Sequence, residues 1–194
     1  MKTIITVIFA GILTYTGAQK NGCNVPGGLQ PMGRTFNKNS FFTGNWYVTH
    51  MKDATNAYDA VCRKYNTYPK DDHMKLDTDG DYTINKEQKH YITTCSSKYS
   101  IPLITHGSIP FDCKHSYNNG DTAKFIFFTV LWTIIDTNYQ DYALAYRCTR
   151  YNDGSIHSGN LVLLQRNKKD NGSKATSSLA SHKLTLSNFQ NLNC

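Results

Sequence analysis

The sequence predicts an all-β fold: an eight-stranded antiparallel up-and-down barrel followed by a short C-terminal helix. Helical periodicity is nearly absent between Gly44 and Arg166, where short strand-like runs are separated by turn residues. Aromatic residues make up 12% of the chain, a proportion that suits strands or an aromatic-lined cavity. Because a closed barrel leaves no unpaired edge, sequential hairpins favour it over an open sheet.

Eight or nine strands are predicted, mostly joined by tight turns. They are Gly44–Met51, Val61–Tyr68, Met74–Asp77, Asp81–Asn85, Lys89–Cys95, Ser108–Lys114, Ala123–Ile135, Tyr142–Tyr151 and Ser158–Arg166. The hairpin turns are predicted at Asp79-Gly80, Asn119-Gly120 and Asn152-Asp153-Gly154, because such pairs adopt the left-handed conformations that tight hairpins need. A helical turn is expected within Asn37–Phe42 and a short helix within Ala175–Leu184.

The first eighteen residues have the pattern of a secretory signal peptide. A basic start at Lys2 precedes an apolar run over Ile4–Leu13, and Thr16 and Ala18 place small residues before the expected cleavage point. The run is too short for a membrane anchor, which needs roughly 20 apolar residues. We therefore expect residues 1–18 to be a signal peptide and residues 19–194 to form one secreted domain that does not span a membrane.

The six cysteines fit an oxidising, extracellular compartment. They are Cys23, Cys62, Cys95, Cys113, Cys148 and Cys194. An even number in a secreted chain predicts three disulfides, and the absence of any CxxC spacing argues against structural zinc. Six cysteines allow fifteen pairings, and their spacing does not choose among them.

The chain carries a formal net charge of +7, with its basic residues scattered along the sequence. Without a dense Lys/Arg block, a nucleic-acid partner is not expected. Solubility explains the charge most simply, and an anionic surface or ligand is the alternative. Asn171-Gly172-Ser173 is an N-glycosylation sequence in a polar loop.

Three separated motifs resemble those of the lipocalins. Gly44-Asn45-Trp46 matches the Gly-x-Trp motif of their first strand. Thr137–Tyr142 is similar to their Thr-Asp-Tyr-x-x-Tyr turn, with Asn138 in place of Asp. Arg166 stands where lipocalins place an arginine over the tryptophan, a cation–π contact that closes one end of the barrel. The resemblance gives Trp46 and Arg166 structural roles.

The resemblance extends to the triabin/nitrophorin lipocalins of blood-feeding triatomine bugs. Trp46–His50, the segment Tyr142–Leu144 and Leu161–Asn167 are the most similar stretches. The resemblance implies a salivary anti-haemostatic protein. It also implies the disulfides Cys23–Cys148 and Cys62–Cys194, which leave Cys95 with Cys113.

The alternation of side chains along strands predicts which residues line the barrel interior. Cysteines bonded to the chain termini must face outward, so their neighbours in sequence face inward. The same reasoning applies from Trp46 and Arg166. The predicted ligand-binding residues are Arg147, Arg63, Tyr65, His50, Val48, Phe127, Ala145, Val162 and Leu164.

An inward-facing arginine is costly without an anion, and its guanidinium suits phosphate or carboxylate. The alternatives are a protein partner such as Asp136 or Asp141, or a solvated position at the barrel mouth. We expect capture of a small host agonist, with ADP or another adenine nucleotide first, and inhibition of platelet aggregation. Tyr65 and Phe127 would stack on the base. Biogenic amines, thromboxane A2 or leukotrienes are alternative ligands, and Asp53, Asp59 and Asp136 keep an amine open.

A rival function of another class is inhibition of a clotting protease through loops 53–60 and 96–105. Catalysis is not expected, because no nucleophile elbow, HExxH or P-loop motif occurs. No cofactor is expected either: His73 and His90 do not match the haem-ligand register of the relatives, and both suit surface positions near turns. We expect a monomer.

Overall fold

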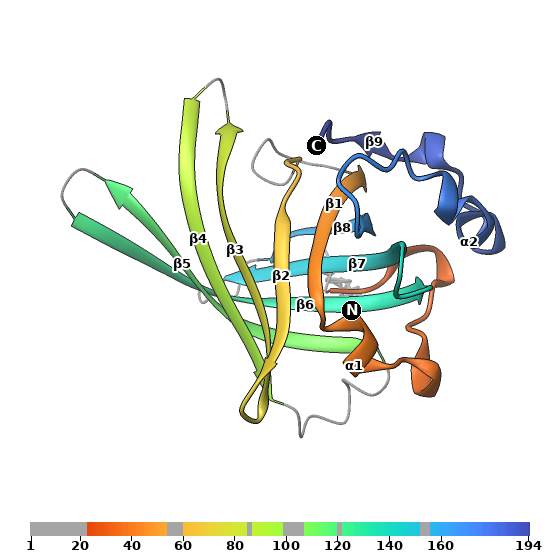
Figure 1. Cartoon of the computed structure of the whole chain (residues 1–194), viewed down its shortest axis with the longest axis horizontal. Coiled ribbons are helices and arrows are strands. Elements are labelled where there is room, and N and C mark those ends of the chain that lie inside the picture. Colours follow the sequence, from red (N-terminus) through yellow and green to blue (C-terminus); the bar gives the residue numbers. More distant parts are fainter. Residues whose placement is uncertain (1–22, 54–59, 85–86, 99–106, 120–121, 152–155) are drawn as a thin grey trace, which may run out of the picture.

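The computed structural model describes residues 23–53, 60–84, 87–98, 107–119, 122–151 and 156–194 (Figure 1). The predicted signal peptide, residues 1–18, and the predicted turn Asn152-Asp153-Gly154 lie outside these residues. No helix in the described part of the chain is both long and apolar enough to cross a membrane.

The strands form one antiparallel sheet that closes into a barrel. They are β1 (Gly44–Lys52), β2 (Lys64–Lys70), β3 (His73–Ile84), β4 (Glu87–Lys98), β5 (Ser108–Asn119), β6 (Thr122–Thr137), β7 (Tyr142–Tyr151), β8 (Ile156–Gln165) and β9 (Gln190–Asn191). Each of the first eight pairs with its neighbour in sequence, and β1 pairs with both β2 and β8, which closes the ring. The predicted eight-stranded barrel is therefore confirmed, with β9 added beside β1. Two residues are too short to show a strand pattern in the sequence.

The hairpin predicted at Asp79-Gly80 is wrong. These residues lie within the long strand β3, opposite Ile92 and Tyr91 of β4. The turn dipeptide is tolerated there because alternation continues through it and β4 supplies an unbroken partner. At Asn119-Gly120, β5 ends at Asn119, which pairs with Thr122 of β6, and Gly120 lies outside the described residues.

The helices are short and lie outside the strand region, as the sequence predicts. Helix α1 (Lys38–Phe41) begins after Asn37, whose side chain accepts a hydrogen bond from the Ser40 amide at 3.1 Å. Helix α2 (Thr176–Ser181) lies near the C-terminus, inside the predicted range. Single 3-10 turns cover Pro26–Gly28, Gly33–Thr35, Ser173–Ala175 and Leu186–Asn188.

Two apolar clusters lie on opposite sides of the barrel wall. The interior cluster includes Val162 and Leu164 of β8, whereas Leu161 and Leu163 of the same strand belong to an outer cluster. Leu179 of α2 and other C-terminal residues complete the outer cluster. The C-terminal segment therefore covers the outside of β7 and β8.

All three disulfides have the pairing that the family resemblance implies: Cys23–Cys148, Cys62–Cys194 and Cys95–Cys113. The first two join residues 125 and 132 positions apart and fasten the terminal segments to the wall. Each stabilises the fold by about 2–4 kcal/mol, largely by restricting the unfolded chain. Cys95 and Cys113 belong to the interior cluster.

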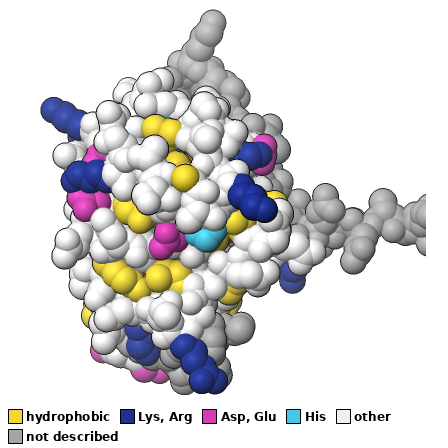
Figure 2. All heavy atoms as spheres, turned by 90° about the vertical axis from the view of Figure 1, so that its right-hand side faces the viewer, with side chains coloured by type: hydrophobic (Ala, Val, Ile, Leu, Met, Phe, Trp, Pro, Cys, Tyr) yellow, Lys and Arg dark blue, Asp and Glu magenta, His cyan; other side chains and the backbone are white. Residues whose placement is uncertain are grey.

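The surface over α2 carries charges of both signs. In Figure 2, which looks at this face, basic and acidic side chains lie beside one another at several places rather than in one basic block. This face therefore fits the interpretation of the net positive charge as a contribution to solubility.

A candidate ligand site in the barrel interior

One end of the barrel is closed by Trp46 and Arg166. The Arg166 guanidinium lies 3.6 Å from the centre of the Trp46 ring and donates hydrogen bonds to five backbone carbonyls. The Trp46 indole donates to the carbonyl of Phe41 at 3.0 Å. Burial lowers the pKa of Arg166 to about 10, so the group stays charged at neutral pH. The two predicted structural residues thus tie α1 to the first and eighth strands.

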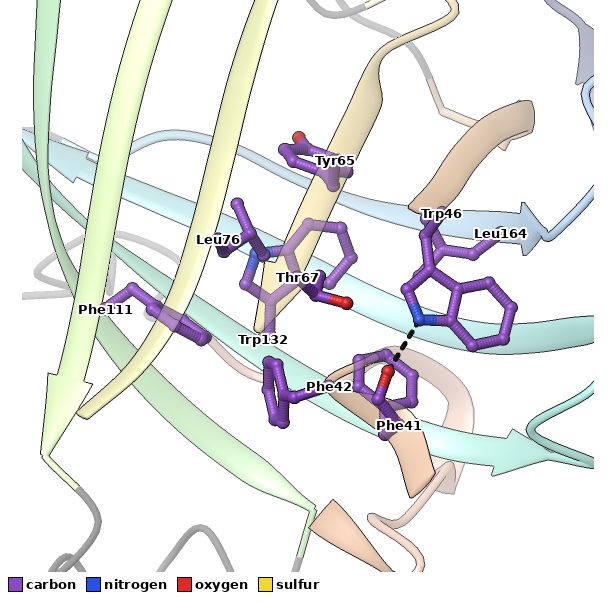
Figure 3. A pocket seen from close by; sticks show the side chains of 9 residues that line it. All are labelled: Phe41, Phe42, Trp46, Tyr65, Thr67, Leu76, Phe111, Trp132 and Leu164. Atoms are coloured by element: carbon purple, nitrogen blue, oxygen red, sulfur yellow. Dashed lines mark hydrogen bonds between the residues drawn. The ribbon is translucent and has the colours of Figure 1, made fainter. Parts of the chain in front are cut away.

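The half of the interior next to this closed end is filled by side chains. Those around its centre are Phe41, Phe42, Trp46, Tyr65, Thr67, Leu76, Phe111, Trp132 and Leu164 (Figure 3). The space left between them measures about 10 Å³, roughly enough for one water molecule. Ligand sites usually measure about 300–1,000 Å³. The expectation of a hollow barrel therefore fails for this half, where Phe41 and Phe42 fold into the interior.

Arg147 lies in the interior above this filled half. It is 5% exposed and donates a hydrogen bond to the Tyr65 hydroxyl at 3.2 Å. The Tyr65 ring meets Trp132 edge to face, with centroids 5.4 Å apart. Arg147 also sits opposite Trp132 in the β6–β7 register. A buried guanidinium next to two aromatic rings can bind an anion and the planar or apolar group attached to it.

Polar groups from β4 and β5 continue this interior surface away from the closed end, in the part that we call the mouth half of the barrel. The Thr93 hydroxyl lies 2.8 Å from Nδ1 of His115, and the rings of Tyr91 and His115 are 4.8 Å apart. Burial lowers the pKa of His115, and the nearby positive charge of Arg63 lowers it further. Arg63 is therefore close to His115, and it lies two residues before Tyr65 on the same face of the chain.

The predicted interior residues mostly take the expected positions. Val48, Tyr65, Ala145, Val162 and Leu164 belong to the interior cluster. Arg147 joins them through its bond to Tyr65. Their role in binding a ligand stays a prediction.

The prediction that His50 faces the interior is wrong. A β-bulge between Val48 and His50 shifts the β1–β8 register, so the alternation reverses there. Met51 belongs to the interior cluster instead. The His50 ring lies outside the barrel, next to Gly172 of the C-terminal segment. A Cβ atom at position 172 would be only 3.3 Å from Cε1 of His50. Burial under this segment lowers the pKa of His50, and Asp170 partly opposes the shift.

The prediction that Phe127 lines the interior is also wrong. Val130, Trp132 and Ile134 of β6 face inward, so odd-numbered residues before the bulge face outward. Phe127 is 52% exposed. Its ring therefore cannot stack on a ligand inside the barrel.

The carboxylates considered as partners for Arg147 lie outside the barrel. Asp136 accepts a hydrogen bond from Ser178 of α2, and Asp141 is paired with Lys174. Asp53 is largely exposed beside Lys52. Among the side chains that the structure describes, those that face the barrel interior include Arg147, Arg63 and His115 but no Asp or Glu. This part of the interior favours an anion over a cation.

The sequence reasoning missed His115, Thr93 and Trp132. A signal existed in the alternation along β5: once Cys113 faces inward, His115 must do so too. Neither Cys95 nor Cys113 bonds to a terminal segment, so the sequence offered no reference for the direction of these strands.

A closed eight-stranded antiparallel barrel, with an arginine over a tryptophan at one end, is a lipocalin-type fold. Residues 22–179 match the model of the Triabin family, and the chain belongs to this family. Triafestin-2 of Triatoma infestans is 33% identical over 172 residues, which cover 86% of this chain and 79% of that protein. Platelet inhibitor triplatin-2 of the same species is 29% identical, over 87% of this chain and 84% of the relative.

The fold also matches solved structures. The amine-binding protein of Rhodnius prolixus, solved as its tryptamine complex, superposes with a TM-score of 0.65 at 22% identity. The match covers 86% of this chain and 85% of that chain. At this identity the likeness shows the shared barrel and leaves the ligand of this chain to its own residues.

Proposed function

We propose that the protein captures an anionic small molecule in the mouth half of its barrel, without chemical conversion. The observation that carries the proposal is the buried guanidinium of Arg147, bonded to Tyr65 and close to Trp132. The guanidinium offers charged N–H donors in a planar fork, a geometry that suits a phosphate or carboxylate.

Adenine nucleotides, and ADP first, are the ligands that we test first. Arg147 and Arg63 would bind the phosphates, and Tyr65 would offer a ring to the base. Removal of free ADP would inhibit platelet aggregation, and platelet inhibitor triplatin-2 is named for such an activity. The protein would act as a secreted, salivary monomer, and its three disulfides suit an extracellular setting.

Calorimetric titration with ADP, a stable thromboxane A2 analogue, serotonin and noradrenaline tests this proposal. We expect saturable, one-to-one heat with ADP or with the carboxylate-bearing analogue. Saturable heat with an amine and none with either anion would contradict it. Such a result would align this chain with the tryptamine-binding structure.

An outer surface patch supports a second function, inhibition of a clotting protein by direct contact. Ile92 of β4 is 40% exposed, and Phe125 and Phe127 of β6 are 50% and 52% exposed; the two strands flank β5. Lys114 of β5 lies between them, with its ammonium group 3.9 Å from the centre of the Phe125 ring. Grouped exposed aromatic residues are typical of protein-binding surfaces.

Clotting-time assays with purified factors, run beside platelet aggregation, separate the two functions. Prolonged clotting that disappears in the Phe127→Ser variant would support the contact surface. Normal clotting times at saturating protein would exclude it.

A further inference from the structure

Asn160 on β8 is a fully buried amide with one unpartnered atom. Its side chain is 0% exposed, and its Nδ2 donates to the backbone carbonyl of Asp53 at 2.5 Å. Its Oδ1 is buried and lacks a hydrogen-bond donor within the described structure. Leaving a buried acceptor unsatisfied is costly, so a donor supplied by a ligand would stabilise this oxygen.

The position of Asn160 connects it with Arg147. The two residues are directly opposite each other in the β7–β8 register. Paired residues project from the same face, with Cβ atoms about 5 Å apart. Val162 and Leu164, two and four residues further along β8, face the interior, so Asn160 faces it too. The acceptor is thus adjacent to the buried guanidinium on the same interior surface.

We propose that Asn160 determines specificity by accepting a hydrogen bond from the ligand, next to the anion held by Arg147. This inference rests on the proposed function and narrows its ligand class. The captured molecule carries both an anionic group and an N–H or O–H donor nearby. A nucleotide or a hydroxylated carboxylate lipid satisfies both groups, whereas an unsubstituted fatty acid leaves the Asn160 oxygen without a partner.

Discrimination follows from this arrangement because a buried polar atom binds poorly to an apolar group. A site that satisfies a hydrogen bond rejects the analogue lacking the donor, since both desolvation and the missing bond count against it. Asn160 acts by contact with the ligand and performs no chemistry on it.

Two matched pairs of probes test the inference. They are ADP with 2′,3′-dideoxyadenosine 5′-diphosphate, which lacks the ribose hydroxyls, and 5-hydroxyeicosatetraenoic acid with arachidonic acid. For wild-type protein we expect the donor-bearing member of a bound pair to bind about tenfold more tightly. In Asn160→Leu this preference disappears, through loss of affinity for the donor-bearing member alone.

Gln165→Leu is the matched control variant. Gln165 is also a fully buried β8 amide with an unpartnered atom, Nε2, and one bonded atom, Oε1, which accepts from Thr49. It lies five residues from Asn160, on the outer face of the strand, so its loss leaves the preference for donor-bearing probes unchanged. Asn160→Ser serves as a second variant where Asn160→Leu does not fold, and it also reduces the preference.

The outcomes separate the two proposals. If wild-type protein binds none of the four probes, the proposed function fails, and this inference fails with it. If it binds an anionic probe but shows no preference for the donor, or keeps the preference in both Asn160 variants, this inference is overturned while capture of an anion stands.

Discussion

The two halves of the barrel interior contain similar residue types arranged for different purposes. At the closed end, the Arg166 guanidinium is fully engaged by an indole ring and five backbone carbonyls. In the mouth half, Arg147 lies among Tyr65, Trp132 and the unpartnered oxygen of Asn160. An arginine that binds backbone carbonyls holds the fold together, whereas one facing polar side-chain atoms and aromatic rings can exchange partners with a ligand.

The two halves also differ in how their side chains pack. Nine side chains leave about 10 Å³ near the closed end, so a ligand would have to displace the core there. Towards the mouth, the described pairing between β4 and β5 stops at Ile92 and Ser116. Beyond this pair the β3–β4 and β5–β6 hairpins continue and diverge from each other (Figure 1). The comparison separates a packed layer that holds the fold together from the layer in which we propose that a ligand binds, and each layer can be altered separately.

Arg166→Met gives the largest expected effect. Loss of the charged hydrogen bonds and of the ring contact lowers the free energy of unfolding by about 3 kcal/mol. Denaturant unfolding followed by tryptophan fluorescence measures this loss. Ligand affinity of the folded variant stays within about twofold, because the site lies in the other half; a specific collapse of affinity would break the comparison.

Arg147→Met reverses this pattern. Affinity for the anionic ligand falls by about ten- to a hundredfold, because a charge-assisted contact is lost while side-chain volume is retained. The control is Arg150→Met, which removes an exposed arginine from the same strand. Calorimetry on both variants makes the measurement, and equal losses in the two would show that only overall charge matters.

A smaller effect is expected from pH. The folded-state pKa values of His115 and His50 are lowered, so the unfolded chain binds protons more readily. Stability therefore falls as pH drops below about 6.5 and stops falling below the folded-state pKa values. Unfolding curves at pH 7.5 and 5.5 should show this, and His115→Gln and His50→Gln should each reduce the difference.

The same pH experiment compares the inside of the barrel with the outside. A bound anion near Arg63 favours protonated His115, so ligand reduces the acid sensitivity that depends on His115. His50 lies outside the barrel, so its contribution is unchanged. The His50→Gln variant retains the contribution of His115. If its loss of stability between pH 7.5 and 5.5 is the same with and without ligand, the anion does not bind near His115.

Phe127→Ser has the smallest expected effect. The ring is about half exposed, so stability changes by less than about 0.5 kcal/mol and ADP affinity does not change. Thermal unfolding and calorimetry check both expectations. A marked loss of ADP affinity would contradict the outward direction of this side chain.

The sequence predicted the closed end better than the mouth, for physical reasons. Trp46 and Arg166 belong to motifs that resemble those of the lipocalins, and the disulfide pairing follows from the same resemblance. Alternation placed Arg147, Tyr65 and Val162 correctly because no bulge intervenes between them and their reference residues. The turn predicted at Asp79-Gly80 failed because only the pairing with β4 distinguishes these two residues from a turn.

Features set by tertiary packing were beyond sequence reasoning. The bulge after Val48 leaves no clear mark in the residues and moves His50 to the outside. The half of the interior next to the closed end is filled because α1 directs Phe41 and Phe42 inward, and no strand pattern in the sequence predicts this. The direction of His115 needed the orientation of the Cys95–Cys113 disulfide, which spacing does not provide.

A crystal structure grown with ADP tests the central claim most directly. The account predicts electron density for the nucleotide inside the barrel, with phosphate oxygens within hydrogen-bonding distance of Arg147. The half next to the closed end should still be filled by Phe42 and Trp132. Nucleotide bound only to the outer surface, with the Arg147–Tyr65 contact untouched at saturating ADP, would contradict it.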